Sequence, residues 1–287
     1  MNNAKLSYRG WKNKFHDILS EIYDDREVES LFFGTLDMIG WSKLDYILKD
    51  EEHPSKKDEK RLASALKRLQ TGEPLQYITG KVFFDDLTLN IDERALIPRP
   101  ETEELVHWIV TMNLAVTSIL DVCTGCGCIA LALRNRLDTA KVFGWDISDE
   151  ALSLANENKV KLGLDVSFFK GDALGDWSEI GDTTYDVIVS NPPYIPQSDA
   201  RLMFKNVLEH EPHMALFVSD DDPLIFYREI AKRALKFLKP GGRLYFEIHE
   251  DFPQDMIDLM ELLGYVDIEV KKDLQGKDRM LCAHKRA

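Results

Sequence analysis

The chain has 287 residues, of which 44% are hydrophobic and 30% are charged. Such a composition is typical of a folded globular protein and argues against a disordered or fibrous chain. Asp and Glu number 50 and Lys and Arg number 36, so the formal net charge is -14 and a phosphate backbone would be repelled over much of the surface. We therefore expect no stable nucleic-acid binding.

The sequence offers no targeting or membrane signal. Residues 1–19 contain no uninterrupted apolar core of the kind that a secretory signal needs. No later stretch approaches the ~20 apolar residues of a membrane span. Three of the four cysteines lie within residues 123–128, which does not resemble a disulfide framework. We expect a cytoplasmic protein with reduced thiols and no membrane association.

The first part of the chain has a helical pattern that ends at Gly72-Glu73-Pro74. Apolar residues recur in it at a spacing of three to four, which is typical of amphipathic helices. The pattern predicts a helical bundle over residues 1–73, to which we assign substrate docking. Examples of the spacing are Trp11, Phe15, Ile18, Leu19 and Ile22, and then Leu62, Ala65, Leu66 and Leu69.

Residues 74–100 are predicted to form a linker that contains a β-hairpin. Within it, residues 82–91 form two short apolar runs on either side of the turn Asp85-Asp86. Two prolines, Pro98 and Pro100, then fix the backbone just before an amphipathic helix.

The main domain is predicted over residues 101–287, where apolar strand-like runs alternate with helical segments. This alternation predicts an α/β fold with a mainly parallel sheet covered on both faces. In such open sheets, ligands bind at the carboxyl ends of the strands. The predicted strands are 118–122, 141–145, 166–170, 185–190, 243–248, 266–270 and 280–283, and the predicted helices are 102–112, 128–136, 149–162, 223–238 and 253–263.

The first strand of this domain is followed by the segment 123–128, with two glycines and small side chains that let the backbone approach a ligand closely. A Gly-x-Gly pair alone is weak evidence, and a dinucleotide fingerprint would place a third glycine where Ala130 stands. The loop by itself leaves the cofactor open. The spacing of Cys123 and Cys126 resembles that of zinc ligands, but a fourth ligand is missing, so no metal is predicted.

Acidic residues follow the next two strands. Asp146 lies about 20 residues after the glycines, where a carboxylate can accept hydrogen bonds from ribose hydroxyls. Asp172 ends the third strand and could accept from an adenine amino group, although the N-cap of a helix is an equally good interpretation of Asp172 alone.

The segment Asn191-Pro192-Pro193-Tyr194 follows the apolar strand 185–190. Prolines lack a backbone N–H and stiffen the chain, so the carbonyls of Asn191 and Pro192 are expected to face the cleft as acceptors. An NH2 group on a planar carbon would satisfy this corner by donating to the Asn191 side-chain oxygen and the Pro192 carbonyl. The ring of Tyr194 could then stack on the flat acceptor group.

These four residues resemble the Asn-Pro-Pro-Tyr signature of amino-methyltransferases, and three further segments resemble the HemK/PrmC family over nearly the whole chain. The segments are residues 72–80, residues 96–103 and His210-Glu211-Pro212. The resemblance implies a class I S-adenosylmethionine-dependent methyltransferase fold. That fold is Rossmann-like, with a mainly parallel seven-stranded sheet, and is joined here by a small N-terminal helical domain.

The resemblance also implies a reaction, a cofactor and a partner. Family members use S-adenosylmethionine to methylate the glutamine side chain in the Gly-Gly-Gln motif of class 1 peptide-chain release factors. The first-strand turn of the family usually has a glycine and a small hydroxyl residue where Cys123 and Cys126 stand here. Some members have an aromatic residue at the position of Ala173, and Trp177 lies four residues later in this chain.

We assign site residues from the motifs and the resemblance together. The predicted catalytic residues are Asn191, Pro192 and Tyr194, and the predicted substrate-binding residues are these three with Pro193, Phe83 and Glu211. The predicted cofactor-binding residues are Arg99, Glu101, Cys123, Thr124, Gly125, Cys126, Gly127, Asp146, Ile147, Asp172, Ala173 and Asn191.

Two other functions fit the same residues. An amino-methyltransferase acting on adenine N6 or cytosine N4 of a nucleic acid would use the same corner on a flipped base. A noncatalytic scaffold would bind the cofactor through the segment 123–128 but would transfer no methyl group. We expect a monomer that meets release factors as its partners.

Overall fold

The computed structural model describes residues 5–113, 115–181 and 183–287. The chain divides into two compact units. The smaller runs through Lys81 and takes in Phe204–His210, and the larger comprises Val82–Met203 and Glu211–Ala287. The predicted hairpin, apart from Lys81, therefore belongs to the larger unit, and the smaller unit extends beyond residue 73.

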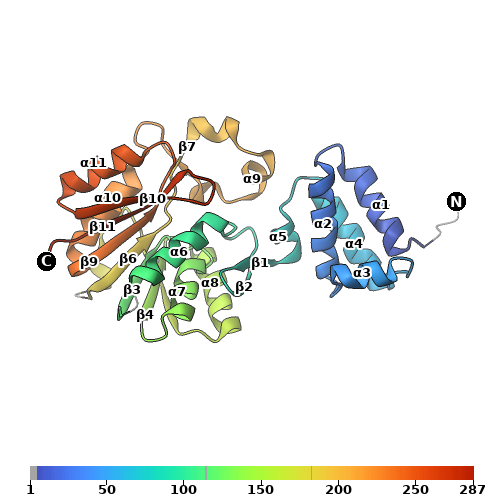
Figure 1. Cartoon of the computed structure of the whole chain (residues 1–287), viewed down its shortest axis with the longest axis horizontal. Helices are drawn as coiled ribbons and strands as arrows, with labels where there is room; N and C mark the ends of the chain where they lie inside the picture. Colours follow the sequence, from blue (N-terminus) through green and yellow to red (C-terminus); the bar gives the residue numbers. More distant parts are fainter. Residues whose placement is uncertain (1–4, 114, 182) are drawn as a thin grey trace. The chain divides into compact units, whose positions relative to one another are not determined.

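The smaller unit is helical, and in Figure 1 its helices before residue 81 are blue to teal while the helix of residues 205–210 is yellow. Its first four helices begin at polar N-caps, and the Asp24 side chain accepts from the backbone of Arg26 and Glu27 within a capping box. A short helix that the sequence pattern does not predict starts after Pro74 and ends at Gly80, which has a φ of +69°. The helices are α1 (Tyr8–Leu19), α2 (Asp25–Asp37), α3 (Lys43–Lys49), α4 (Lys56–Leu69), α5 (Leu75–Thr79) and α9 (Lys205–His210).

The larger unit is built on a seven-stranded sheet with the order β10-β11-β9-β6-β3-β4-β5. The pairs β9–β6, β6–β3, β3–β4 and β4–β5 are parallel, and β11 is antiparallel to both its neighbours. The predicted mainly parallel seven-stranded sheet is thus confirmed. The strands are β3 (Ser118–Val122), β4 (Lys141–Asp146), β5 (Val166–Lys170), β6 (Tyr185–Ser190), β9 (Leu238–Glu247), β10 (Val266–Lys272) and β11 (Asp278–His284).

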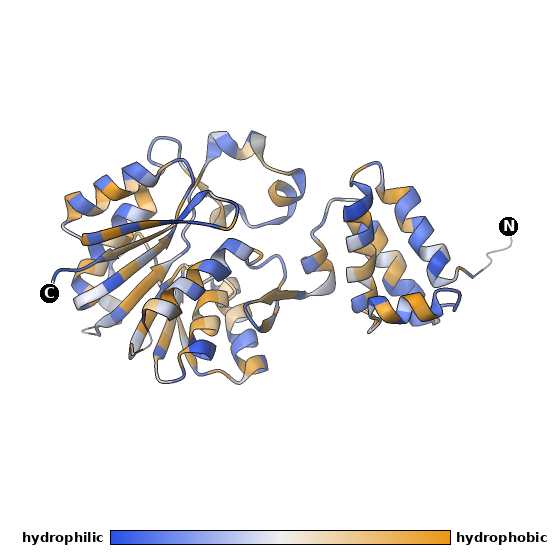
Figure 2. Cartoon of the chain, viewed as in Figure 1, coloured by the Kyte–Doolittle hydropathy of each residue, from blue (hydrophilic) through white to orange (hydrophobic). Residues whose placement is uncertain are grey.

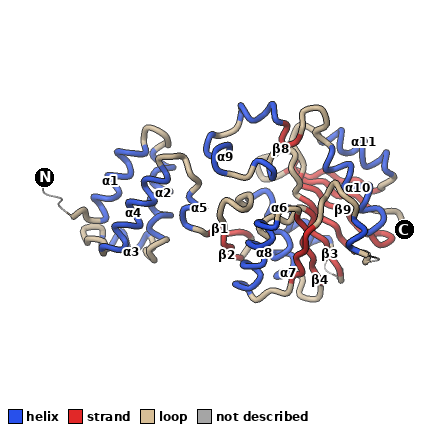
Figure 3. The backbone as a smooth tube through the Cα atoms, turned by 180° about the vertical axis from the view of Figure 1, so that it is seen from behind, coloured by secondary structure: helices blue, strands red, loops and turns tan. Residues whose placement is uncertain are grey.

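Helices cover both faces of this sheet (Figure 3). The strands that lie between these helices are largely coloured as hydrophobic in Figure 2. Alternate residues of a strand point to opposite faces. Leu244 and Phe246 pack in the cluster that contains Tyr227 of α10, whereas Tyr245 contacts Trp108 of α6 on the other face. The helices of this unit are α6 (Pro100–Met112), α7 (Cys128–Arg136), α8 (Asp149–Leu162), α10 (Ile225–Phe237) and α11 (Pro253–Leu263).

The hairpin of the larger unit has strands β1 (Lys81–Phe84) and β2 (Leu87–Asn90) on either side of the predicted turn. Asp85 has a φ of +44° at this turn, and its carboxylate accepts from Arg136 Nη2 at 2.6 Å. Together with a hydrogen bond to His107, this arginine holds the pKa of Asp85 below its usual range despite burial.

Residues 177–218 contain short elements that the sequence pattern does not predict. They are η1 (Trp177–Ile180), β7 (Ile195–Pro196), η2 (Gln197–Leu202), η3 (His213–Ala215) and β8 (Phe217–Val218), besides α9. Runs of two to six residues are too short for a periodic signal. None of the helices within residues 5–113, 115–181 and 183–287 combines the length and apolar character that a membrane crossing requires.

One buried side chain joins the hairpin, α8 and the loop after β3. Asn158 is fully buried, and its Nδ2 donates to the carbonyls of Asn90 and Cys126, each at 3.1 Å. Its Oδ1 accepts from the Asn90 amide at 2.6 Å. Removing the side chain would take this partner from three backbone groups, of which the Cys126 carbonyl is buried.

We predict that Asn158→Ala lowers the free energy of unfolding by about 2–4 kcal/mol, because it creates a cavity and unsatisfied polar groups together. Urea-induced unfolding measures the change. Asn156→Ala is the matched control, since Asn156 lies exposed on the same helix. Equal losses of unfolding free energy in both variants would contradict the role of Asn158 in joining the hairpin, α8 and the loop after β3.

Candidate functional site

A cavity of about 360 Å³ opens at the carboxyl ends of the parallel strands. Its position agrees with the rule for open α/β sheets. Residues from the loops after β3, β4, β5 and β6 meet there with the segment that precedes α6. Of the predicted site residues, those that line it are Arg99, Cys123, Thr124, Gly125, Cys126, Asp146, Ile147, Asp172, Ala173, Asn191 and Pro193.

The loop after β3 turns sharply through left-handed backbone conformations. Cys123 has a φ of +62° and Gly125 a φ of +56°. A Cβ at Gly125 would meet no atom within 4 Å, so open space lies in front of this part of the loop. Cys123 stands in a conformation that glycine adopts most easily, and a side chain there costs roughly 1–2 kcal/mol. The conformation is kept because the surrounding hydrogen bonds fix it.

Two carboxylates hold this loop in place. Asp146 Oδ2 accepts from the Gly125 amide at 2.8 Å, and its Oδ1 accepts from the Ser148 amide at 2.9 Å. Burial raises the pKa of Asp146, and these backbone hydrogen bonds oppose the shift. Each oxygen of a carboxylate has a second lone pair, so Asp146 can still accept from ligand hydroxyls.

Asp121 lies fully buried beneath the same loop. Its Oδ2 accepts from Thr124 Oγ1 at 2.5 Å and from the Ala130 amide at 3.2 Å. Burial raises the pKa of Asp121 to about 7, although the hydrogen bonds from Thr124 and Ala130 favour the charged form. Asp121 therefore ties the loop to the start of α7.

The loop after β5 brings Asp172 and Ala173 to the cavity. Asp172 Oδ1 accepts from the Leu174 amide at 2.8 Å within a turn, so Asp172 is not the N-cap of a helix. Trp177 is 1% exposed and donates through Nε1 to the Ala173 carbonyl at 3.3 Å. The tryptophan thus packs in the core, and the small Ala173 faces the cavity.

The acceptor corner Asn191-Pro192-Pro193-Tyr194 follows β6. Asn191 and Pro193 line the cavity, while Pro192 is buried. The ring of Tyr194 lies edge-on to His249, with 6.0 Å between ring centroids, and its hydroxyl donates to Glu247 Oε1 at 3.0 Å. The tyrosine is therefore anchored beside the cavity wall.

Arg99 and Glu211 pair with each other. Glu211 is only 4% exposed, and its Oε1 accepts from Arg99 Nη2 at 2.6 Å. Its Oε2 accepts from the Ile97 amide at 3.1 Å. Both oxygens of Glu211 are thus engaged in joining the segment before α6 to the loop that contains Pro212. Arg99, Ile97 and Pro212 line the cavity.

Six predicted site residues within the described ranges do not line the cavity. They are Phe83, Glu101, Gly127, Pro192, Tyr194 and Glu211. Phe83 is 73% exposed on β1. Glu101 accepts from Gln275 Nε2 at 3.0 Å near the surface. Gly127 has a packing role, because a Cβ there would lie 2.8 Å from the ring of Phe168.

Sequence reasoning missed two buried polar residues of the site. Thr102 lines the cavity, and Glu247 lies beside the acceptor corner. Glu247 is the last residue of β9, so the expectation of ligands at strand ends could have drawn attention to it. Met214 and Phe226, which also line the cavity, come from segments without a motif.

All four cysteines are free thiols. Burial raises the pKa of the Cys123 thiol well above its usual value. Within the part of the chain that the structure describes, no group of three or more His, Cys, Asp or Glu side chains is arranged to hold a metal ion.

Two family models match the chain. One is described as the methyltransferase small domain and matches residues 102–215, and the other is described as the PrmC N-terminal domain and matches residues 13–80. A relative from Bacteroides thetaiotaomicron, named release factor glutamine methyltransferase, is 44% identical over 93% of this chain and 96% of its own length. The chain belongs to the release factor glutamine methyltransferase family. A relative of the same name from Flavobacterium psychrophilum is 39% identical, over 95% of this chain and 97% of its own.

Solved structures support the fold of this release factor glutamine methyltransferase family member. A methyltransferase from Pyrococcus furiosus matches with a TM-score of 0.52 and 18% identity, over 69% of this chain and 89% of the other. A human methyltransferase 10 domain containing protein matches with a TM-score of 0.52 and 16% identity, over 70% of this chain and 89% of the other. The predicted methyltransferase fold is therefore confirmed.

We predict that Asp121 makes the stability of this family member fall as the pH rises. The pKa of Asp121 is about 7 in the folded chain, against an ordinary value of 3.8. Its contribution to the free energy of unfolding is therefore fully present below pH 3.8 and is lost as the pH rises through about 7. In Asp121→Asn the amide oxygen can accept the same two hydrogen bonds without a charge. Between about pH 4 and about pH 8, the wild type should lose about 1–3 kcal/mol more than the variant.

Urea-induced unfolding of both proteins over this pH range measures the difference. A constant offset between the two curves is expected from the exchanged amide group and carries no information on titration. Parallel pH profiles would mean that Asp121 does not titrate in this range.

Proposed function

We propose that this protein transfers a methyl group from S-adenosylmethionine to the side-chain amide nitrogen of the glutamine in the Gly-Gly-Gln motif of class 1 peptide-chain release factors. Membership of the family supports the reaction. The proposal depends on one observation: Asn191 of the acceptor corner and the loop after β3 line the same cavity. A methyl donor and an amide nitrogen need to meet in such a place.

The residues present fit S-adenosylmethionine. The open space in front of Gly125 allows a ligand to approach the backbone closely. Asp146 has lone pairs for ribose hydroxyls. Asp172 lines the cavity, and its Oδ1 accepts from the Leu174 amide at 2.8 Å.

When bound, S-adenosylmethionine supplies a methyl group made electrophilic by the adjoining sulfonium. The residues that would hold it are those of the loop after β3, with Asp146 and Ile147 after β4 and Asp172 and Ala173 after β5. Asp172 can accept from an amino group through the oxygen that does not contact Leu174.

The acceptor corner suits a weak nucleophile. The lone pair of an amide nitrogen is delocalised into its carbonyl, so the nitrogen reacts only when it is well oriented. Asn191, which lines the cavity, would accept one hydrogen of the NH2 group through Oδ1. Pro192, which does not line the cavity in this structure, would accept the other hydrogen through its carbonyl and so fix the plane of the group. Hydrogen bonds to these acceptors become stronger as positive charge develops on nitrogen, which favours the transition state over the ground state. The methylated nitrogen is acidic while it is cationic and loses one proton to water.

The amino group of a nucleobase would fit the same corner and is the rival substrate. The net charge of -14 disfavours a nucleic acid. Supplying labelled S-adenosylmethionine with either a class 1 release factor or DNA separates the two substrates. Label on the Gly-Gly-Gln peptide, located by mass spectrometry, is the expected outcome. Label on DNA alone would overturn the proposal, and no transfer despite cofactor binding would favour a noncatalytic scaffold.

We predict that Asn191→Ala lowers kcat for methyl transfer by at least about 100-fold, because one acceptor for the NH2 group is lost. The dissociation constant of S-adenosylmethionine, measured by calorimetry, should stay within about threefold, since the other residues that line the cavity would make most of the cofactor contacts. Asn135→Ala, an exposed change on α7, is the control. Undiminished turnover in Asn191→Ala would remove Asn191 from the mechanism.

A further inference from the structure

A buried carboxylate lies next to the acceptor corner. Glu247 ends β9 and is only 2% exposed. Ser190 of β6 lies opposite Phe246 of β9, so Asn191 and Glu247 each come one residue after this pair. A buried carboxylate is costly unless hydrogen bonds satisfy its oxygens. Its place beside the corner therefore calls for a role that an apolar side chain could not fill.

Two hydroxyl groups donate to this carboxylate. Thr102 Oγ1 donates to Glu247 Oε2 at 2.6 Å, and the Tyr194 hydroxyl donates to Glu247 Oε1 at 3.0 Å. Burial raises the pKa of Glu247, and these two hydrogen bonds oppose the shift. The same carboxylate thus contacts the first turn of α6 and the end of the acceptor corner.

The hydroxyl of Thr102 decides how the Asn191 amide is oriented. A threonine hydroxyl has one proton, and Thr102 donates it to Glu247, so its oxygen can only accept from other neighbours. Asn191 Nδ2 donates to this oxygen at 3.3 Å. The amide oxygen of Asn191 is then the end that remains for a ligand in the cavity.

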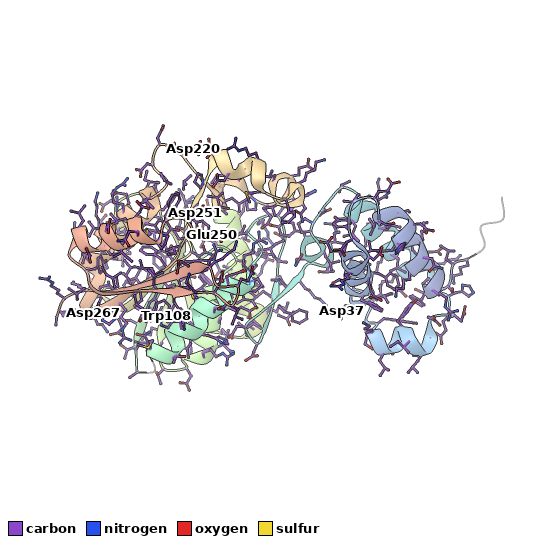
Figure 4. All side chains as sticks on the ribbon, turned by 45° about the horizontal axis from the view of Figure 1, so that its top comes forward. Asp37, Trp108, Asp220, Glu250, Asp251 and Asp267 are labelled. Carbon is purple, nitrogen blue, oxygen red and sulfur yellow. The ribbon has the colours of Figure 1, made fainter. Side chains whose placement is uncertain are left out.

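The two elements that hold this network are fixed to each other. Trp108 of α6, labelled in Figure 4, packs edge-on against Tyr245 of β9 with 5.4 Å between ring centroids. Asn113 Nδ2 donates to the Tyr245 hydroxyl at 2.9 Å. Because the backbones of α6 and β9 are held in this way, the network is ordered before a substrate binds.

We propose that Glu247 and Thr102 are positioning residues for methyl transfer and act through Asn191 and Tyr194. Glu247 accepts hydrogen bonds from both hydroxyls, and Thr102 Oγ1 accepts one from Asn191 Nδ2. The Asn191 oxygen is thereby presented to the substrate NH2 group. The inference rests on the proposed function, because it explains how the acceptor corner of that function is set.

The position of Glu247 fits an indirect role. Glu247 does not line the cavity, and both its oxygens are engaged by Thr102 and Tyr194. Without the Thr102 hydroxyl, the Asn191 amide could rotate and turn its own NH2 group toward the substrate. Two donors would then face each other, and the substrate nitrogen would lose one of its acceptors.

Thr102→Val tests the role, because it keeps the shape of the side chain and removes the hydroxyl. We expect kcat toward a release factor to fall about 10- to 100-fold, because a misoriented acceptor leaves the reacting nitrogen poorly positioned. The KM for the release factor and the dissociation constant of S-adenosylmethionine should stay within about threefold. Thr102→Ser should restore kcat to within about threefold of wild type, because the hydroxyl returns.

Thr111→Val is the matched control, since Thr111 lies exposed on the same helix and donates to the His107 carbonyl at 2.8 Å. Its kcat should equal that of the wild type. A kcat of Thr102→Val within twofold of wild type would overturn the inference. So would a loss of kcat that Thr102→Ser fails to restore, or one matched by an equal loss of cofactor affinity.

Glu247→Gln gives a second test. Glutamine offers one acceptor and one donor in place of two acceptors, so one hydroxyl contact must be lost or reversed, and kcat should fall about tenfold. In the double variant with Thr102→Val, the combined loss should be smaller than the product of the single losses, because both act on one network. Losses that multiply would contradict a shared network. If the wild type itself transfers no methyl to release factors, the proposed function fails instead.

Discussion

Parallel strand pairing is the constraint on which the site depends. Phe246, Ser190, Val122, Trp145 and Phe169 lie side by side across five neighbouring strands. The residue that follows each of these five therefore lies at the carboxyl end of its strand, on the same side of the sheet. In sequence, the five positions span more than a hundred residues. Four of those next residues are Glu247, Asn191, Cys123 and Asp146, and each belongs to the cavity wall or to the network behind it. The register of these parallel strands thus brings the loop after β3, Asp146 and the acceptor corner to the same end of the sheet.

Behind the cavity wall, buried polar side chains hold these loops in place. Asn158 satisfies the backbone near the loop after β3, Asp121 ties that loop to α7, and Glu211 joins the segment before α6 to a later loop. A buried polar group without partners would be costly, so each of these side chains is strongly restricted in its orientation. The wall of the cavity is accordingly built from irregular backbone that is nevertheless well defined.

Most of the fold could be predicted from the sequence, since strands such as 118–122 and helices such as 149–162 have clear apolar periods. The short elements between residues 195 and 218 could not, because two-residue strands have no period. The predicted contacts of Glu101 and Phe83 with ligands stay predictions; in the structure Glu101 contacts Gln275 and Phe83 is exposed on β1. A place in a sequence segment does not fix the direction in which a side chain points.

The sequence by itself determined the strand ends at which ligands bind and the acceptor-rich chemistry of residues 191–194, because both depend on local pattern and on the missing donors of proline. Only the tertiary structure decided which buried groups orient those acceptors. Thr102 and Glu247 are 145 residues apart in sequence and 2.6 Å apart between oxygens. Such a contact arises from the packing of α6 on β9, and no local pattern in either segment encodes it.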